Sequence, residues 1–206
     1  MSRINDAYLG NQNLKRSNVK IAWTPQQVQE WMKCAGDPEY FIETYIKIVN
    51  VDRGLINFNL YSYQKDIVDL AVKERFVICK MPRQCGKTTT LVGLMLWYVI
   101  FHDRYSVAIL AHKLQQAREI LSRIQLAYEH LPKWIQQGIL EWNKGNIELE
   151  NGSKILASAT SSSAIRGGSF NLVYLDEFAF VENNMQEDFF ASVYPTISSG
   201  QTTKVL

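Results

Sequence analysis

A lysine and two threonines stand together in a short segment that can bind phosphate. This segment matches the end of a phosphate-binding P loop through six residues: Gln84, Cys85, Gly86, Lys87, Thr88 and Thr89. In such a loop, backbone N–H groups and the positive end of a helix dipole face the phosphates. The Lys87 side chain would contact the β- and γ-phosphates of a nucleotide, and the Thr88 hydroxyl would bind Mg²⁺. The general motif has a glycine five residues before Gly86, where this chain has Met81.

Two adjacent carboxylates near the end of the chain supply a second feature of nucleotide hydrolysis. The apolar run Leu172–Leu175 predicts a buried strand that carries Asp176 and Glu177 at its carboxyl end. Asp176 can hold Mg²⁺ through water, and Glu177 can polarise an attacking water as a general base. Asp176 follows Lys87 by 89 residues, a spacing that fits P-loop ATPases with an extra strand between the two motifs. Together the motifs predict an ATPase site that uses ATP and Mg²⁺.

Two further features near the loop each admit two interpretations. Arg83 lies inside the loop, where a guanidinium can stabilise the transferred phosphoryl group as an arginine finger in cis. It can equally be an ordinary exposed arginine. Gln64 precedes Lys87 by 23 residues. Its amide can pair with the N6 and N7 edge of adenine while Tyr63 stacks on the base, which would select ATP. Packed tyrosines at the start of a helix fit the same residues.

Other residue types exclude several kinds of site. The three histidines and three cysteines have no metal-ligand spacing, and no cluster of acids indicates a two-metal nuclease. No nucleophile and base can be combined into a triad. The segment 161–169 is rich in serine and glycine and carries Arg166. It fits a nucleotide-sensing or DNA-phosphate contact as well as it fits a plain surface loop.

Alternating helices and short apolar strands must position these residues. From residue 61 the pattern predicts helices over 63–73, 87–101 and 115–130, and strands over 76–80, 105–111 and 171–175. Asn151-Gly152 predicts a hairpin that joins residues 146–150 to 154–159. Strands that alternate with helices indicate an α/β fold, a P-loop NTPase core with a mostly parallel sheet flanked by helices.

The chain before this core divides into two parts. Residues 1–22 are polar and without periodicity, and they predict a flexible arm. Residues 23–60 predict a small helical segment. Its first helix has the sequence of a capping box, with Thr24 at the N-cap, Pro25 at the first helical position and Gln27 closing the box.

The core itself covers residues 61–206 and has an unusual last segment. Residues 202–206 have the sequence of the start of a strand, and a domain rarely finishes on such a strand. We therefore expect a core that is truncated before its end.

Composition excludes several classes of protein. Hydrophobic residues make up 47% and charged residues 20%, which argues against a disordered chain. The net charge of +2 is too small for a protein that coats nucleic acid by charge alone. An odd number of cysteines without a CxxC pair indicates a reducing compartment. With no signal peptide and no apolar run long enough to span a bilayer, we expect a soluble intracellular chain.

These residues resemble the ATPase part of the terminase large subunit of T-even-like tailed phages, the motor that packages DNA into the prohead. The resemblance runs from about Trp23 to the end and includes the segments 34–63, 82–88, 110–113, 138–152 and 176–177. A loop that opens without glycine is a feature of that family. The resemblance implies that Arg83 is a cis arginine finger and that Tyr63 and Gln64 read adenine. It likewise implies that Glu177 is the catalytic carboxylate and Asp176 the Mg²⁺ partner.

The same resemblance implies partners and a place of action. Expected partners are double-stranded DNA, the phage portal protein and the small terminase subunit, with a homo-oligomeric ring on the prohead and no membrane. The expected location is the host cytoplasm, with transient docking on the prohead. Those large subunits continue into a coupling motif, a second small subdomain and a C-terminal nuclease domain, which is absent from these residues. We therefore expect no DNA cleavage from this chain.

Two other functions remain open. A helicase-like DNA translocase could have a similar core and differ in needing free duplex instead of prohead and portal. A truncated protein could also bind nucleotide or partner subunits without hydrolysis, which the unfinished strand at Leu206 favours.

Overall fold

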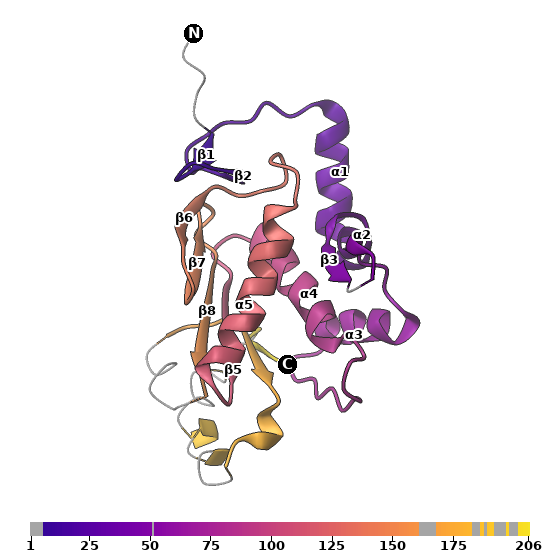
Figure 1. The fold of residues 1–206 in the computed structure, drawn as a ribbon, viewed down its shortest axis with the longest axis vertical. Helices are drawn as coiled ribbons and strands as arrows, with labels where there is room; N and C mark the ends of the chain where they lie inside the picture. The colour runs from indigo at the N-terminus through magenta and orange to yellow at the C-terminus, as the bar shows by residue number, and fades with distance from the viewer. Residues whose placement is uncertain are drawn as a thin grey trace.

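A six-stranded, mostly parallel sheet lies at the centre of the fold (Figure 1). The computed structural model describes residues 6–50, 52–160, 168–182, 186–187, 189–191, 197 and 202–206. In spatial order the strands are β10 (Lys204–Val205), β9 (Leu172–Asp176), β5 (Ser106–Ala111), β8 (Lys154–Ala159), β7 (Asn146–Leu149) and β6 (Ile139–Trp142). The first four run parallel, whereas β7 and β6 continue the sheet antiparallel. The predicted α/β class is therefore confirmed.

Strand β5 shows why this sheet is covered on both faces. Its residues Val107–Ala111 are at most 1% exposed. Val107 and Ile109 join the main core, while Ala108 and Leu110 join a smaller cluster on the opposite face with Phe189. Because successive side chains of a strand point to opposite faces, a continuous apolar run buries both.

Three helices contribute many of the residues of the main core: α3 (Ser62–Lys73), α4 (Lys87–Phe101) and α5 (Leu114–Glu129). α5 packs along β5 and β8, and α4 packs between α3 and α5. All residues of α4 from Thr90 to Ile100 are buried, as expected for a helix that is apolar on every side. Within the described residues, none of the helices combines the length and the apolar character needed to cross a bilayer.

The first N-terminal helix, α1 (Pro25–Gly36), begins at the predicted residue, and α2 (Pro38–Tyr45) follows it. The Thr24 Oγ1 accepts from the Gln27 N–H at 3.2 Å, and the Gln27 Oε1 accepts from the Thr24 N–H at 2.9 Å, so the capping box is confirmed. α2 packs on α4 at Gly93, where a β-carbon would lie 2.9 Å from Ile42 Cγ1. A hairpin of β3 (Lys47–Asn50) and β4 (Gly54–Asn57) follows, which the sequence pattern did not predict.

A second unpredicted hairpin lies within the segment that the sequence pattern assigns to a flexible arm. β1 (Ala7–Tyr8) pairs with β2 (Asn11–Lys15), and Arg16 bridges to Ile139 at the edge of the central sheet. The Lys15 ammonium forms an ion pair with Glu150 at 2.8 Å. The hairpin has too few apolar residues for a hydrophobic pattern to predict it. Its polar side chains and backbone instead bond to side chains more than 100 residues away in the sequence.

The prediction of a strand before the phosphate loop is wrong. Residues 76–80 form only an isolated bridge, in which Phe76 pairs with Val205. The Val77 N–H donates to the Val205 carbonyl at 3.0 Å, and no ladder follows among the described residues. An apolar run typical of a strand needs a neighbour along its length, and β10 accompanies it at one position alone.

The predicted hairpin at Asn151-Gly152 is confirmed, with β7 and β8 antiparallel. Gly152 adopts φ 80°, and the Leu149 N–H donates to the Ser153 carbonyl at 2.9 Å. The loop is therefore a three-residue turn with glycine at the left-handed position, a common hairpin connection.

Candidate active site

The phosphate loop turns at two residues with left-handed backbone. Gln84 has φ 62° and Gly86 has φ 76°, and α4 begins directly afterwards at Lys87. A β-carbon on Gly86 would lie 2.5 Å from Gln64 Nε2, so both the φ angle and the available space require glycine. The N–H groups in the first turn of α4 have no carbonyl partner within the helix, which allows this turn to bind an anion.

Hydrogen bonds inside the loop support the turn. The Cys85 thiol donates to the Pro82 carbonyl at 3.0 Å, and the Thr90 hydroxyl donates to the Gly86 carbonyl at 3.1 Å. Thr88 and Thr89 are the second and third residues of α4, and both are half-buried. The predicted loop therefore does open a buried helix.

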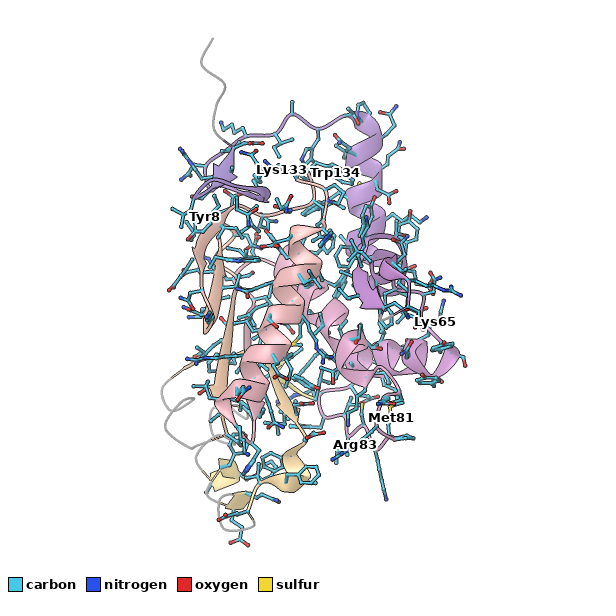
Figure 2. All side chains as sticks on the ribbon, viewed as in Figure 1. Tyr8, Lys65, Met81, Arg83, Lys133 and Trp134 are labelled. Carbon is cyan, nitrogen blue, oxygen red and sulfur yellow. The ribbon has the colours of Figure 1, made fainter. Side chains whose placement is uncertain are left out.

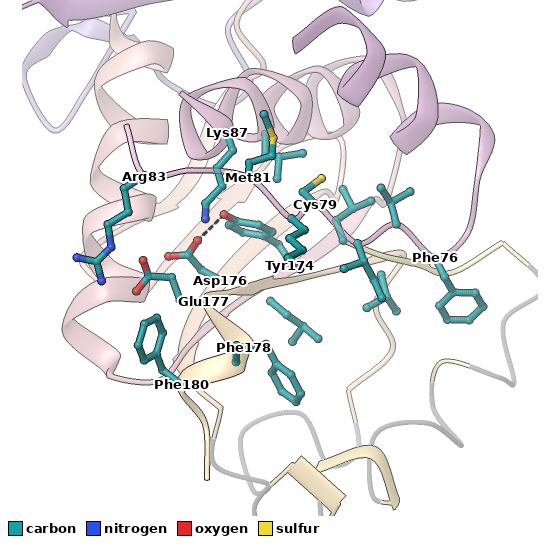
Figure 3. Close-up of a pocket in the computed structure, with 18 of the residues that line it drawn as sticks. Phe76, Cys79, Met81, Arg83, Lys87, Tyr174, Asp176, Glu177, Phe178 and Phe180 are labelled. Carbon is teal, nitrogen blue, oxygen red and sulfur yellow. Dashed lines mark hydrogen bonds between the residues drawn. The ribbon is translucent and has the colours of Figure 1, made fainter. Parts of the chain in front are cut away.

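A pocket of about 740 Å³ joins this loop to the end of β9 (Figure 3). Arg83 and Lys87 from the loop line the pocket together with Asp176 and Glu177 from the strand end. In Figure 3 the Lys87 side chain extends toward Asp176, and the Arg83 guanidinium points toward Glu177. The fold thus gathers two cations and two carboxylates from segments that are far apart in the sequence.

Tyr174 fixes the orientation of the first carboxylate, a role that the sequence pattern did not reveal. Its hydroxyl donates to Asp176 Oδ1 at 2.7 Å, the dashed contact in Figure 3. Burial raises the pKa of Tyr174 above its ordinary value, the charge of Asp176 raises it further, and a hydrogen bond with Thr88 acts in the opposite direction. The phenol therefore stays neutral and remains a donor to Asp176. Tyr174 and Asp176 are two residues apart on β9 and so lie on the same face of the strand, and this spacing could have indicated the pair.

Glu177 adopts a backbone conformation that is uncommon for a residue with a side chain. Its φ and ψ are 50° and 38°, between β9 and the short 3₁₀ helix Phe178–Phe180. Such a left-handed residue costs on the order of 1–3 kcal/mol, which the surrounding fold must offset. The turn takes Glu177 out of the line of the strand, so that its side chain borders two pockets.

The second pocket, of about 220 Å³, lies between α4 and α5. Besides Thr88, Asp176 and Glu177 it is lined by α5 residues that the sequence analysis did not assign: Gln116, Glu119, Ile120 and Arg123. The polar residues among these repeat at three- and four-residue spacing, which places them on one face of the helix. That periodicity is the signal that could have identified them.

Tyr63 and Gln64 contact the phosphate loop from the start of α3. The Tyr63 hydroxyl and the Gln64 side-chain N–H both donate to the Cys85 carbonyl, each at 3.0 Å. The rings of Tyr61 and Tyr63 stack at 5.7 Å with an interplanar angle of 11° and are both exposed. These residues therefore border the phosphate loop.

One wall of the larger pocket is apolar. It contains Phe76 and Ile78 from the segment before the loop and Phe178 and Phe180 from the 3₁₀ helix. Ile78 is 96% exposed. The charged residues of the site therefore lie beside a wide apolar surface.

Two further sequence expectations concern other ligands. No group of three or more histidine, cysteine or acidic side chains with the geometry of a metal site occurs among the residues that the structure describes. Arg166, for which nucleotide sensing, DNA contact and a plain surface loop are all left open by the sequence, lies outside the described residues.

Comparisons with solved structures place this fold among phage large terminases. The chain is similar to the large terminase of bacteriophage HK97, with a TM-score of 0.68 and 19% identity over 83% of this chain and 36% of that one. It is also similar to the ATPase domain of the large terminase of Thermus phage P74-26, with a TM-score of 0.60 and 15% identity. That match covers 72% of this chain and 64% of the phage domain. At these identities the likeness shows the fold.

Sequence comparisons identify the family. Tripartite terminase subunit 3 of Saimiriine herpesvirus 2 is 25% identical over 134 residues, which is 62% of this chain and 19% of the herpesvirus protein. The chain thus spans about a fifth of the length of that relative. A model of the family described as "Terminase large subunit, T4likevirus-type, N-terminal" matches residues 78–204. Because this match covers more than half of the sequence, the chain belongs to the family of T4likevirus-type terminase large subunits, in their N-terminal part.

Proposed function

We propose that this chain binds ATP with Mg²⁺ and hydrolyses it, as the motor portion of a terminase large subunit that packages double-stranded DNA. The observation that carries the proposal is the pocket shared by Arg83, Lys87, Asp176 and Glu177. It lies at the carboxyl end of β9, where open α/β sheets bind their ligands. A large terminase of bacteriophage D6E with the same fold, at a TM-score of 0.52 and 12% identity over 70% of this chain and 37% of that one, was solved with ADP.

Phosphate binding is assigned to the loop and the first turn of α4. The free N–H groups of this turn and the Lys87 ammonium offer donors and positive charge to the β- and γ-phosphates. The left-handed residues at Gln84 and Gly86 curve the backbone around that position.

The donor set around Thr88 and Asp176 fits Mg²⁺. A hydroxyl and a carboxylate are the hard oxygen ligands that this ion prefers, usually with water and phosphate completing the shell. Tyr174 engages one oxygen of the Asp176 carboxylate and so fixes its orientation. When bound, Mg²⁺ would neutralise charge on the phosphate oxygens.

Hydrolysis requires a group that accepts a proton from water and a group that stabilises the transferred phosphoryl. Glu177 borders both pockets and is the general base of the proposal, the group that would accept a proton from the attacking water. Arg83 extends into the same pocket from the loop and would act in cis on the developing negative charge. The exposed stack of Tyr61 and Tyr63 offers a surface for the adenine ring.

The partners follow from the family and belong to the same proposal. They are double-stranded DNA, the portal protein and the small terminase subunit, with several copies of the large subunit in a ring on the prohead. The place of action is the host cytoplasm at the prohead.

Calorimetric titration of the chain with ATP and Mg²⁺ tests the site. Wild-type protein should bind ATP, and Lys87→Ala should abolish binding. Lys144→Ala, which removes an exposed lysine from the turn between β6 and β7, is the matched control and should bind normally. Equal ATP affinity in wild type and Lys87→Ala would refute the assignment of the phosphate loop.

A further inference from the structure

Two side chains from the start of α3 converge on one carbonyl of the phosphate loop. The Tyr63 hydroxyl and the Gln64 Nε2 each lie 3.0 Å from the Cys85 oxygen. A carbonyl oxygen has two lone pairs, so these two donors use its full capacity. The Cys85 carbonyl is therefore held toward α3 by contacts from outside the loop.

The Gln64 side chain is held in this position by hydrogen bonds at both ends of its amide. Its Oε1 accepts from the Tyr61 N–H at 2.9 Å, while its Nε2 donates to the loop, and the residue is 2% exposed. Both ends of the amide thus have partners in the protein. The close approach of Gly86 to Nε2 leaves no room for a side chain between the amide and the loop.

Fixing the Cys85 carbonyl also fixes the next N–H. In a trans peptide the C=O and N–H groups point in opposite directions, and none of the described peptides is cis. With the Cys85 oxygen directed at α3, the Gly86 N–H must point away from α3. Gly86 is the N-cap of α4, so its N–H is among the free donors at the helix start that can meet phosphate.

We infer that Tyr63 and Gln64 are positioning residues for the phosphates, because they orient the Gly86 N–H through the Cys85 carbonyl. This role goes beyond the reading of adenine that the family resemblance assigns to the same pair, and it rests on the proposed function. The consequence is specific. Loss of either donor weakens the binding of the triphosphate itself, whether or not a base is attached.

Inorganic tripolyphosphate with Mg²⁺ is the probe that separates the two roles, because it has phosphates and no base. We compare its affinity with that of ATP in wild type, Tyr63→Phe and Gln64→Met. Tyr63→Phe keeps the aromatic ring and removes one donor, and Tyr8→Phe, which removes a tyrosine hydroxyl from β1 and lines neither pocket, is the matched control. Positioning predicts a loss of tripolyphosphate affinity on the order of fivefold for Tyr63→Phe, the usual effect of one hydrogen bond, and a larger loss for Gln64→Met. Tyr8→Phe should bind like wild type, and the thermal unfolding midpoint of Tyr63→Phe should not change.

The outcomes distinguish this inference from the proposed function. Wild-type tripolyphosphate affinity in both variants, with ATP affinity reduced, would overturn the inference and leave the proposed function intact. If wild type binds tripolyphosphate too weakly to measure, the affinities of the variants for ATP and GTP distinguish the two roles. Positioning lowers both affinities in the same proportion, whereas base reading lowers that for ATP alone. Wild-type protein that binds none of these probes would contradict the proposed function and the inference together.

Discussion

The two edges of the central sheet are held in different ways. At the β6 edge, the β1–β2 hairpin adds a bridge from Arg16 to Ile139 and ion pairs from Lys15 to Glu150 and from Lys133 to Asp6, both at 2.8 Å. At the other edge, the segment before the phosphate loop has one bridge, from Phe76 to Val205, and leaves Ile78 exposed. Figure 2 shows Tyr8 and Lys133 at one end of the molecule and Met81 and Arg83 toward the other.

Because of this difference, we expect one edge to determine the stability of the fold and the other to determine ATP binding and turnover. The β6 edge is fixed by contacts between segments far apart in the sequence, none of which lines the pocket with Lys87 and Glu177. At the loop edge, side chains from α3 and the start of α4 orient the phosphate loop itself. Substitutions at the first edge should therefore change the free energy of unfolding, and substitutions at the second should change ATP binding and turnover.

The largest expected effect lies at the loop edge. Arg83→Ala should slow ATP turnover by on the order of 10³-fold, because it removes the guanidinium that would stabilise the transferred phosphoryl group. Steady-state phosphate release measures this, and the unfolding midpoint should stay unchanged because Arg83 is exposed. Arg118→Ala, an exposed arginine on α5, serves as control. Unchanged turnover in Arg83→Ala would make Arg83 an ordinary surface residue.

A smaller effect is expected at the β1–β2 hairpin, where a substitution should change stability and leave ATP binding unchanged. Leu14 is 1% exposed in the main core, so Leu14→Ala should lower the free energy of unfolding by about 2–5 kcal/mol. Denaturant unfolding measures this, and ATP affinity of the folded protein should not change. Leu9→Ala in the same hairpin removes a side chain that is 89% exposed and should have little effect on stability. A loss of ATP affinity in Leu14→Ala without a loss of stability would contradict the separation of the two edges.

The smallest effect concerns acid pH at the same edge. Burial raises the pKa of Glu150, but the Lys15 ammonium and the N–H groups of Gly138 and Asn18 outweigh it, and the pKa is lowered from its ordinary value of 4.5. A lowered folded-state pKa stabilises the protein above pH 4.5, and this contribution disappears as the pH falls through the folded-state value. The unfolding midpoint of wild type should therefore fall more steeply below pH 4.5 than that of Glu150→Gln. Parallel curves for the two proteins would show that this ion pair does not support the edge.

Local sequence signals were sufficient where the stabilising contacts are local. The capping box of α1 spans four residues, the glycine turn of the β7–β8 hairpin lies within the loop, and the apolar run of α4 predicted both of its ends. The meeting of the phosphate loop with Asp176 and Glu177 could also be predicted, from the presence and order of the two motifs along the chain.

The remaining features depend on contacts that no local pattern encodes. Lys15 and Glu150 are polar residues whose pairing needs the finished fold, so the first hairpin was assigned to an arm. The apolar run before the loop lacks a long neighbour, so it does not become a strand. The bond from Gln64 to the Cys85 carbonyl joins a helix start to a loop, and hydrophobic periodicity carries no information about it.

Mg²⁺-dependent ATP hydrolysis by this chain, measured beside Glu177→Gln, tests the central claim most directly. Glu182→Gln, which changes an exposed glutamate five residues further along the chain, is the control. The account predicts turnover in wild type and in the control, and a Glu177→Gln protein that binds ATP without hydrolysing it. Equal turnover in wild type and Glu177→Gln, or ATP binding without turnover in wild type, would contradict the assignment of Glu177 as the general base of a working ATPase.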